Sequence, residues 1–398
     1  MIHHPAQERD SYYLDGDLWT RGRNAIVFIA LVSWIAAIAG YFLDPNRFFQ
    51  SYLVAFLFAV FIPLGALFFV MIQYLTGSAW SVPMRRISEN IAASIPVGFL
   101  LFLPVAFGVH YLYEWSHTGV VAKDAILRGK ESWLNPIWFL YRGAIFFGLW
   151  TLWSGQIHRH STLQDKTGSL KHMHTISRWS APGLLMLVLS VTLASFDWSM
   201  SLNPHWYSTI FGLYCFAGGA RIFMSTWFLI CRGLRDKGVL RNTINIEHYH
   251  DLGKWMFALT IFWAYMAFSQ YMLIWYANLP EETIWFRHRF VGTWGVLSFV
   301  LHFFTSYYRH LIFRASKRNL KILTLMAVWI LVTQYLDFYW QVMPTFHAAG
   351  VVPHWLDLVC LAATLSTLAL AFWMRVRKHA LLPIRDPRFE QGLQFQNS

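Results

Sequence analysis

Two aspartates stand out because each closes an apolar stretch and is followed seven residues later by a proline. They are Asp197, followed by Pro204, and Asp337, followed by Pro344. An acid within the hydrocarbon region of a membrane is costly, and is therefore a candidate functional group. A carboxylate can take up and release a proton, and a nearby guanidinium affects its pKa. The repeated spacing suggests two proton-exchanging sites of the same kind.

Further polar residues lie in or at the ends of the apolar stretches. They are His110, Glu114 and Arg142 before Asp197, and Arg221, Gln270, His302 and Gln334 before Asp337. Each half of the chain thus holds an acid, an arginine and a histidine, which suits a relay in which carboxylate and imidazole exchange protons. The alternative is that each aspartate and arginine neutralise one another between helices and only fix the packing.

Two further groups would lie at the mouths of such a path. His205 directly follows Pro204 and would face outward. The segment HYHDLGK contains His248, His250, Asp251 and Lys254 just before a later apolar stretch. These side chains could collect protons at the inner mouth. A solvated helix start, with Asp251 near the positive end of the helix dipole, explains the same residues without function.

The composition requires a membrane as solvent. The 398 residues are 56% hydrophobic and 13% charged, with a mean hydropathy of +0.40. A helix needs about 20 apolar residues to cross the hydrocarbon region. We find ten such stretches: Asn24–Leu43, Gln50–Leu75, Asn90–Tyr111, Pro136–Ile157, Trp179–Met200, Trp206–Cys231, Lys254–Ala277, Phe290–Ile312, Leu320–Val342 and Trp355–Met374. The sequence thus predicts an all-α polytopic membrane protein with ten transmembrane helices.

The basic residues indicate the orientation. Of 32 Lys and Arg, 24 fall on the side that holds both chain ends and 6 on the other. Because basic residues accumulate in cytoplasmic loops, both termini are expected in the cytoplasm, with tails at 1–23 and 376–398. The cations are dispersed over many loops, so the +12 net charge does not indicate a nucleic-acid partner.

The two Asp-Pro motifs are four helices apart, which is the offset that tandem four-helix bundles would produce. The expected first bundle is 48–203, with helices 2 to 5, and the second is 204–345, with helices 6 to 9. Helix 1, in 24–47, and helix 10, in 346–375, flank them.

No cofactor is expected in this chain. Cys215, Cys231 and Cys360 are isolated, so the sequence has no CxxC pair for zinc and no CxxCH for covalent haem. A b-type haem needs two facing histidines, whereas His110 and His302 belong to different predicted bundles. The sequence therefore predicts no metal site and no haem in this chain.

Two long segments carry a family resemblance. SFDWSMSLNPHWYSTIFG and HDLGKWMFALTIFWAYMAFSQYMLIWYANLPEET resemble signature segments of the ActF-type integral-membrane subunits of bacterial alternative complex III, which are similar to NrfD/PsrC-type subunits. The match extends over nearly all ten predicted helices. It implies two four-helix bundles with peripheral helices, in the bacterial cytoplasmic membrane.

The resemblance also implies a function and partners. The complex is a quinol:electron-acceptor oxidoreductase in which quinol is oxidised at an ActC-like NrfD-type subunit, while the ActF-type subunit is proposed to carry protons. Iron-sulfur and c-haem subunits and small membrane subunits would be the other partners, and they would hold the haem c, the iron-sulfur clusters and the quinol. Alternatives are a quinone-binding subunit, a structural scaffold, or a stand-alone secondary transporter whose helices break at Pro63 or Gly218-Gly219.

Overall fold

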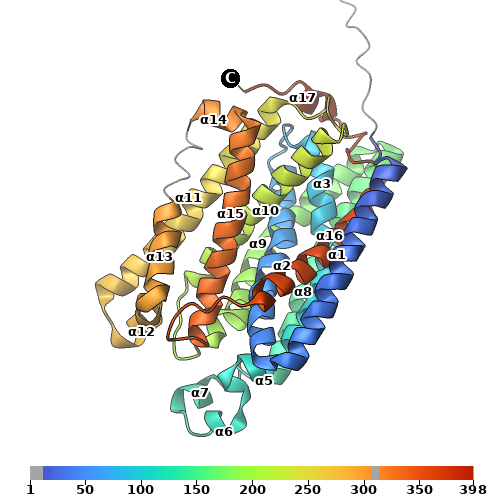
Figure 1. The fold of residues 1–398 in the computed structure, drawn as a ribbon. Helices are drawn as coiled ribbons and strands as arrows, with labels where there is room; N and C mark the ends of the chain where they lie inside the picture. The colour runs from blue at the N-terminus through green and yellow to red at the C-terminus, as the bar shows by residue number, and fades with distance from the viewer. Residues whose placement is uncertain (1–11, 306–312, 398) are drawn as a thin grey trace, which may run out of the picture.

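A computed structural model describes residues 12–305 and 313–397, apart from the side chains of 302, 304 and 305. These residues form helices and no strand (Figure 1). Within them, eight helical segments are long and apolar enough to cross a membrane, so the expected polytopic helical class is confirmed. They are α1 (Gly16–Leu43), α2 (Pro45–Leu75), α3 (Val82–Ala92) continued by α4 (Ile95–Phe107), α9 (Leu170–Trp198), α10 (Phe211–Asp236), α11 (Ile246–Ala277), α15 (Leu320–Val342) and α16 (Trp355–Val376).

The other two predicted crossings coincide with helices that are less apolar or shorter. Helix α8 (Pro136–Thr167) has 32 residues, and its last third is polar. Helix α13 (Gly292–Thr305) has 14 residues, and the rest of the predicted crossing, 306–312, lies outside the described residues. The shorter helices are α5 (Val109–Leu112), α6 (Thr118–Val121), α7 (Ala125–Lys130), α12 (Pro280–Arg289), α14 (Arg314–Arg318) and α17 (Phe389–Leu393).

Several helices begin before the apolar stretch that predicted them. Helix α1 begins at Gly16 because the Asp15 carboxylate accepts hydrogen bonds from the backbone N–H groups of Asp17 and Leu18, at 3.0 and 3.2 Å. Residues 16–23, at the end of the predicted N-terminal tail, are therefore helical. The third crossing begins at Val82 in place of Asn90. The first turns of these helices are polar, so a hydropathy window does not include them in the predicted helix.

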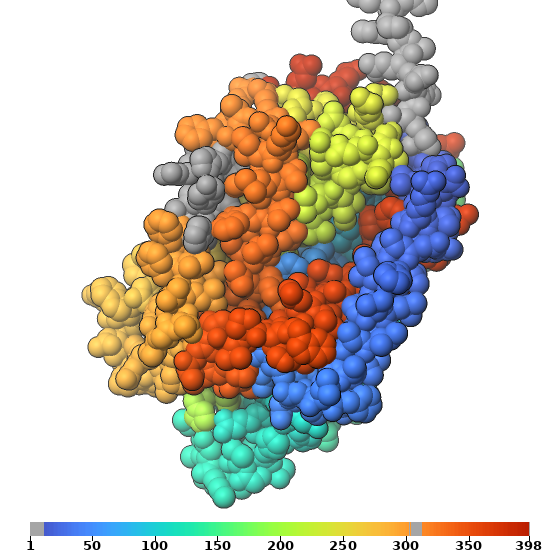
Figure 2. All heavy atoms as spheres, in the orientation of Figure 1, coloured from blue at the N-terminus to red at the C-terminus, as the bar shows by residue number. Residues whose placement is uncertain are grey.

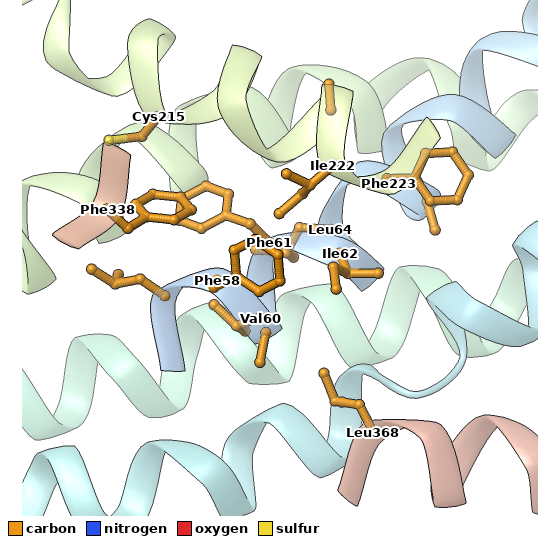
Figure 3. Close-up of a cluster of buried hydrophobic side chains, with 14 of the residues drawn as sticks. Phe58, Val60, Phe61, Ile62, Leu64, Cys215, Ile222, Phe223, Phe338 and Leu368 are labelled. Atoms are coloured by element: carbon orange, nitrogen blue, oxygen red, sulfur yellow. The ribbon is translucent and has the colours of Figure 1, made fainter. Parts of the chain in front are cut away.

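Helix α2 lies at the centre of the molecule. Within its most apolar window, 94% of the residues are buried, and it contacts α1, α3, α4, α9, α10, α15 and α16. Figure 3 shows α2 side chains directed to different sides: the ring of Phe61 stacks on Phe338 at 5.5 Å, while Leu368 of α16 approaches from another side. A helix that is apolar all round belongs inside a larger assembly of helices.

Small residues let α2 and α10 approach closely. A Cβ atom at Gly65 would lie 2.7 Å from the Phe223 Cβ, and one at Gly219 would lie 2.5 Å from the Phe61 ring. Such small residues are typical of helix contacts in membranes. Both helices run without a break through Pro63 and Gly218-Gly219. The helix breaks considered for a transporter are therefore not present at these places.

The remaining long helices fall into groups around this contact. Helices α8 and α9 pack together. Helix α9 contacts α2 directly, and α8 contacts α3 and α4, which both pack on α2. Helices α11 and α15 pack against α10 on the other side, α13 contacts α11 and α15, and α1 pairs with α16 (Figure 1). The segment containing α5, α6 and α7 projects at the end opposite α17 (Figure 1).

The predicted C-terminal tail is packed against the helices. Backbone N–H of Leu381 donates to the Tyr12 carbonyl at 2.8 Å, and Asn245 Nδ2 donates to the Phe395 carbonyl at 3.3 Å. A Cβ atom at Gly392 would meet Pro83 of α3 at 2.9 Å. The segment 377–397 therefore covers the ends of α3 and α11, on the same side as the start of α1 (Figure 1).

Candidate functional site

Asp197 lies at the end of α9 in a bidentate ion pair. Arg142 of α8 donates from Nε to Oδ2 at 2.6 Å and from Nη2 to Oδ1 at 3.0 Å, and Trp133 Nε1 donates to Oδ1 at 2.9 Å. The aspartate is 1% exposed. Such two-bond pairs are among the stronger polar contacts in proteins. The sequence placed Asp197 and Arg142 in the same group, and the structure brings them together.

A cavity of about 390 Å³ approaches this pair from the loop side. Trp133 and Ser201 line it, and each also bonds to Asp197: Trp133 to the carboxylate, and Ser201 to the backbone carbonyl. Lys130 and Tyr207 lie in the same wall. The wall of the cavity is therefore one hydrogen bond from the Asp197 carboxylate.

Asp337, in α15, has neutral partners. Tyr214 donates its hydroxyl to Oδ1, while Gln334 and Gln341 both donate from Nε2 to Oδ2, at 2.8 and 2.9 Å. Arg221 donates from Nε to Gln334 Oε1 at 2.7 Å, so its guanidinium reaches the acid through an amide. The two motifs therefore carry chemically different sites, an ion pair at Asp197 and a network of neutral donors at Asp337.

A cavity of about 10 Å³ borders the second site, and Asp337, Tyr214 and Gln270 line it. Gln270, from α11, accepts a hydrogen bond from Ser208 Oγ at 3.1 Å. The predicted residues Arg221, Gln270, Gln334 and Asp337 thus lie in one buried region.

The segments that follow the two acids meet. Ser199 Oγ donates to Gln341 Oε1 at 3.4 Å, and Asn203 Nδ2 donates to Thr345 Oγ1 at 2.9 Å. Gln341 in turn donates to Asp337. Polar contacts therefore run from Asp337 to Ser199, which is two residues beyond Asp197.

His110 and Glu114 are not part of the first site, contrary to the predicted grouping. Helix α4 ends at Phe107, His110 lies on the short helix α5 and Glu114 begins the following 3-10 turn, Glu114–Ser116, and both side chains are exposed. His110 Nδ1 is 3.1 Å from Ser116 Oγ. His302, the histidine predicted for the second site, lies in α13, and its side chain is outside the described residues.

His205 pairs with an acid of the projecting segment. Its Nε2 is 2.6 Å from Asp124 Oδ2, and the two side chains are 42% and 29% exposed. This hydrogen bond, together with the backbone N–H groups of Leu127 and Ile126, holds the pKa of Asp124 below its ordinary value. His205 therefore lies at the solvated surface, as expected for a mouth residue, and its partner is Asp124.

The HYHDLGK segment begins α11. His248 accepts at Nδ1 from the backbone N–H of Asn245 at 3.1 Å, and the Asn245 side chain accepts from the backbone N–H of His248 at 3.2 Å. His248 therefore caps the N-terminus of α11 together with Asn245. His250 and Asp251 are buried with their side chains 3.7 Å apart, and Asp251 also pairs with Lys254.

A buried ionic network at the same end escaped the sequence analysis. Glu89 lies between two neighbouring arginines of α3, 3.3 Å from Arg85 Nε and 3.0 Å from Arg86 Nε. Arg86 also pairs with Asp165 of α8 at 2.8 Å, and Arg85 pairs with Asp386 of the C-terminal segment. Burial alone would raise the pKa of Asp386, but the adjacent Arg85 guanidinium holds it below its ordinary value. The network joins α3, α8 and the C-terminal segment.

Two more arginines that looked like loop residues are buried. Arg47 Nη2 is 2.7 Å from Asp357 Oδ2, which ties the start of α2 to the start of α16. Arg289 donates from Nη1 to the Trp285 carbonyl and from Nη2 to the Gln341 carbonyl, at 2.9 and 2.7 Å. Arg289 thus fixes the backbone of a residue that binds Asp337.

The described residues contain no group of three His, Cys, Asp or Glu side chains placed to hold a metal ion. No protein-family model and no curated protein matches the chain.

Proposed function

We propose that this chain is a proton-carrying membrane subunit, similar to the ActF type, of a bacterial quinol:electron-acceptor oxidoreductase in the cytoplasmic membrane. Quinol is oxidised at a neighbouring NrfD-type subunit, and the electrons pass to iron-sulfur and c-haem subunits. The supporting observation is the pair of buried acids, Asp197 and Asp337, whose motifs repeat in sequence and whose following segments meet through Ser199 and Gln341.

The proposal includes ten crossings, two more than length and composition alone assign within the described residues. Helix α8 spans about 48 Å, which exceeds the ~30 Å of hydrocarbon, so its polar last third can project from the membrane. Helix α13 belongs to the other added crossing, Phe290–Ile312, of which 306–312 lie outside the described residues. The crossings form two four-helix bundles, 48–203 and 204–345, with α1 and α16 as flanking helices and both termini in the cytoplasm.

In this proposal, Asp337 is the residue that changes its protonation state. A proton on Oδ1 can be donated to the Tyr214 oxygen while both glutamine amides still donate to Oδ2. The protonated form therefore keeps both glutamine contacts and reverses the Tyr214 contact, in which the tyrosine oxygen becomes the acceptor. Asp197 keeps its charge in the Arg142 pair and marks the outward end, beside the cavity lined by Trp133 and Ser201.

The orientation can be tested by labelling introduced cysteines. Lys123 and Lys237 are exposed at opposite ends of the molecule, and Cys215, Cys231 and Cys360 are buried, so background labelling should be low. In intact cells, an impermeant maleimide should label the Lys123→Cys variant and leave Lys237→Cys unlabelled until the cells are lysed. The reverse pattern would overturn the orientation.

Purification tests membership in a redox complex. An affinity-tagged chain isolated from its native membrane in mild detergent should carry c-type haem absorbance and iron through its partners. The same chain expressed alone should be colourless and free of iron, because it has no suitable ligand set. Isolation from the native membrane without haem-bearing partners would favour a stand-alone transporter, and stoichiometric iron in the chain expressed alone would contradict the proposal.

A scaffold is the second candidate function. The bidentate Arg142–Asp197 pair and the buried network around Glu89 are both arrangements that fix helix packing. A scaffold and a proton carrier differ in whether loss of the Asp337 carboxylate changes proton movement.

A further inference from the structure

A groove of about 550 Å³ opens sideways between α1, α10 and α16, with α2 at its floor. Figure 2 shows the surface hollowed between these helices. Along α10 the groove extends from Thr226 to Lys237, which corresponds to about 16 Å of helix. Since all four helices are candidate membrane spans, the groove faces the lipid.

The interior of the groove is apolar. Polar side chains in its lining belong to Ser94, Thr226, Lys237 and Trp373. Ser94 donates to the Ile91 carbonyl at 2.6 Å, and Trp373 Nε1 donates to the Trp19 carbonyl at 2.9 Å, so both are already engaged. The interior therefore suits a hydrocarbon chain, and offers few partners for the ring oxygens of a quinone.

Cations gather at one end of the groove. Lys237 lines it where α10 ends and is exposed. Arg23 and Arg377 lie over the Trp19 ring, at 4.8 and 4.2 Å, and Trp19 exchanges two hydrogen bonds with Trp373 in the groove wall. Asp236, the acid next to Lys237, is paired with Arg232 at 3.1 Å. Three cations therefore lie at this end, where the C-terminal segment also lies, with Asp15 and Asp17 as the acids at the start of α1.

We propose that the groove binds an anionic phospholipid, with an acyl chain along α10 and the phosphate at Lys237, Arg23 and Arg377. Such a lipid supplies an apolar chain for the interior and a negative group at the depth of the three cations. Cationic residues at the membrane surface favour anionic headgroups in this way. The inference depends only on the chain spanning a membrane, and is independent of the proposed proton path.

The groove can be filled without disturbing the fold. Gly233 lines it, and a Cβ atom there would meet nothing within 4 Å, so Gly233→Phe places a ring in the acyl site. Gly148, on the exposed face of α8, is equally open and does not line the groove, which makes Gly148→Phe the matched control. A third variant, Arg23→Gln with Lys237→Gln and Arg377→Gln, removes only the three cations.

The test is native mass spectrometry of the full chain, delipidated and titrated with phosphatidylglycerol, phosphatidylcholine or a short-chain quinone. We expect one phosphatidylglycerol to bind at least tenfold more tightly than phosphatidylcholine. Gly233→Phe should lose this binding and Gly148→Phe should keep it. The triple variant should lose about fivefold in phosphatidylglycerol affinity per cation removed, with little change for phosphatidylcholine.

Equal binding of the two lipids to the wild-type chain would overturn the proposal. So would a Gly233→Phe variant that displaces the quinone and leaves phosphatidylglycerol bound. If Gly233→Phe unfolds, the triple variant still tests the proposal. An unchanged preference for phosphatidylglycerol without the three cations would contradict the assigned headgroup site.

Discussion

Replacing Glu89 with glutamine should lower the free energy of unfolding by about 3–5 kcal/mol, because it breaks a buried ionic network. Glu89 accepts from Arg85 and Tyr74 at one oxygen, lies 3.0 Å from Arg86 at the other, and there also accepts from Ser161. Glutamine has no charge and only one acceptor oxygen, so it would leave buried donors without a partner.

The charge count supports a large effect. The ion pairs of this network join three arginines and three acids: Arg85, Arg86, Arg388, Glu89, Asp165 and Asp386. Losing one acid leaves a net positive charge in a buried site. Glu390→Gln, at an exposed position of α17, is the matched control. Thermal unfolding in detergent should separate the two variants clearly, and equal stability would show that the network contributes little.

The second large effect concerns Asp197→Asn, which should also lose about 3–5 kcal/mol of stability. Both carboxylate oxygens of Asp197 accept from Arg142, and Trp133 donates to one of them. The amide group of an asparagine is a donor, so it would face the Arg142 or Trp133 donor without an acceptor between them. The buried Arg142 guanidinium would also lose its counter-charge. Loss of this subunit from the purified complex, or a lowered unfolding temperature, would report the effect.

The same substitution at Asp337 should cost about 1–3 kcal/mol, less than at Asp197, because Tyr214 loses an acceptor but the direct donors to this carboxylate are neutral. Both glutamine donors bind Oδ2 and Tyr214 binds Oδ1, so an asparagine fits with its carbonyl oxygen at Oδ2. Its amide then donates to the Tyr214 oxygen, as a protonated aspartate would. If Asp337→Asn destabilises the protein as much as Asp197→Asn does, Asp337 is an essential charge of the fold and cannot be the residue that exchanges protons.

Part of this site could be predicted from sequence because polar and charged side chains are costly within a membrane, and are therefore rare and easily recognised there. Asp197 with Arg142, and Asp337 with Gln334, stand out against an apolar background, and the structure places each pair in contact. Tyr214 could not be selected in the same way. Tyrosine is common in this sequence, and its contact with Asp337 depends on how α10 and α15 pack, which helical periodicity does not specify.

The missed residues have a related physical cause. Arg85, Arg86 and Glu89 carry the i, i+3 and i, i+4 spacing of helical ion pairs, but they precede the apolar stretch and so fall outside the predicted helix. Arg47 and Asp357 are 310 residues apart, so their contact is a property of the fold alone. Conversely, His110 lies beyond Gly108, where α4 has already ended.

The most direct test of the proton-carrying role is the number of protons moved per electron in vesicles that contain the intact complex with the Asp337→Asn subunit. The variant keeps the two glutamine hydrogen bonds of the site and removes its titratable group. We predict an assembled complex in which quinol-driven electron transfer persists, because quinol is oxidised elsewhere, and in which the protons moved per electron fall below the wild-type ratio. An assembled Asp337→Asn complex with the wild-type ratio would contradict the proposed role.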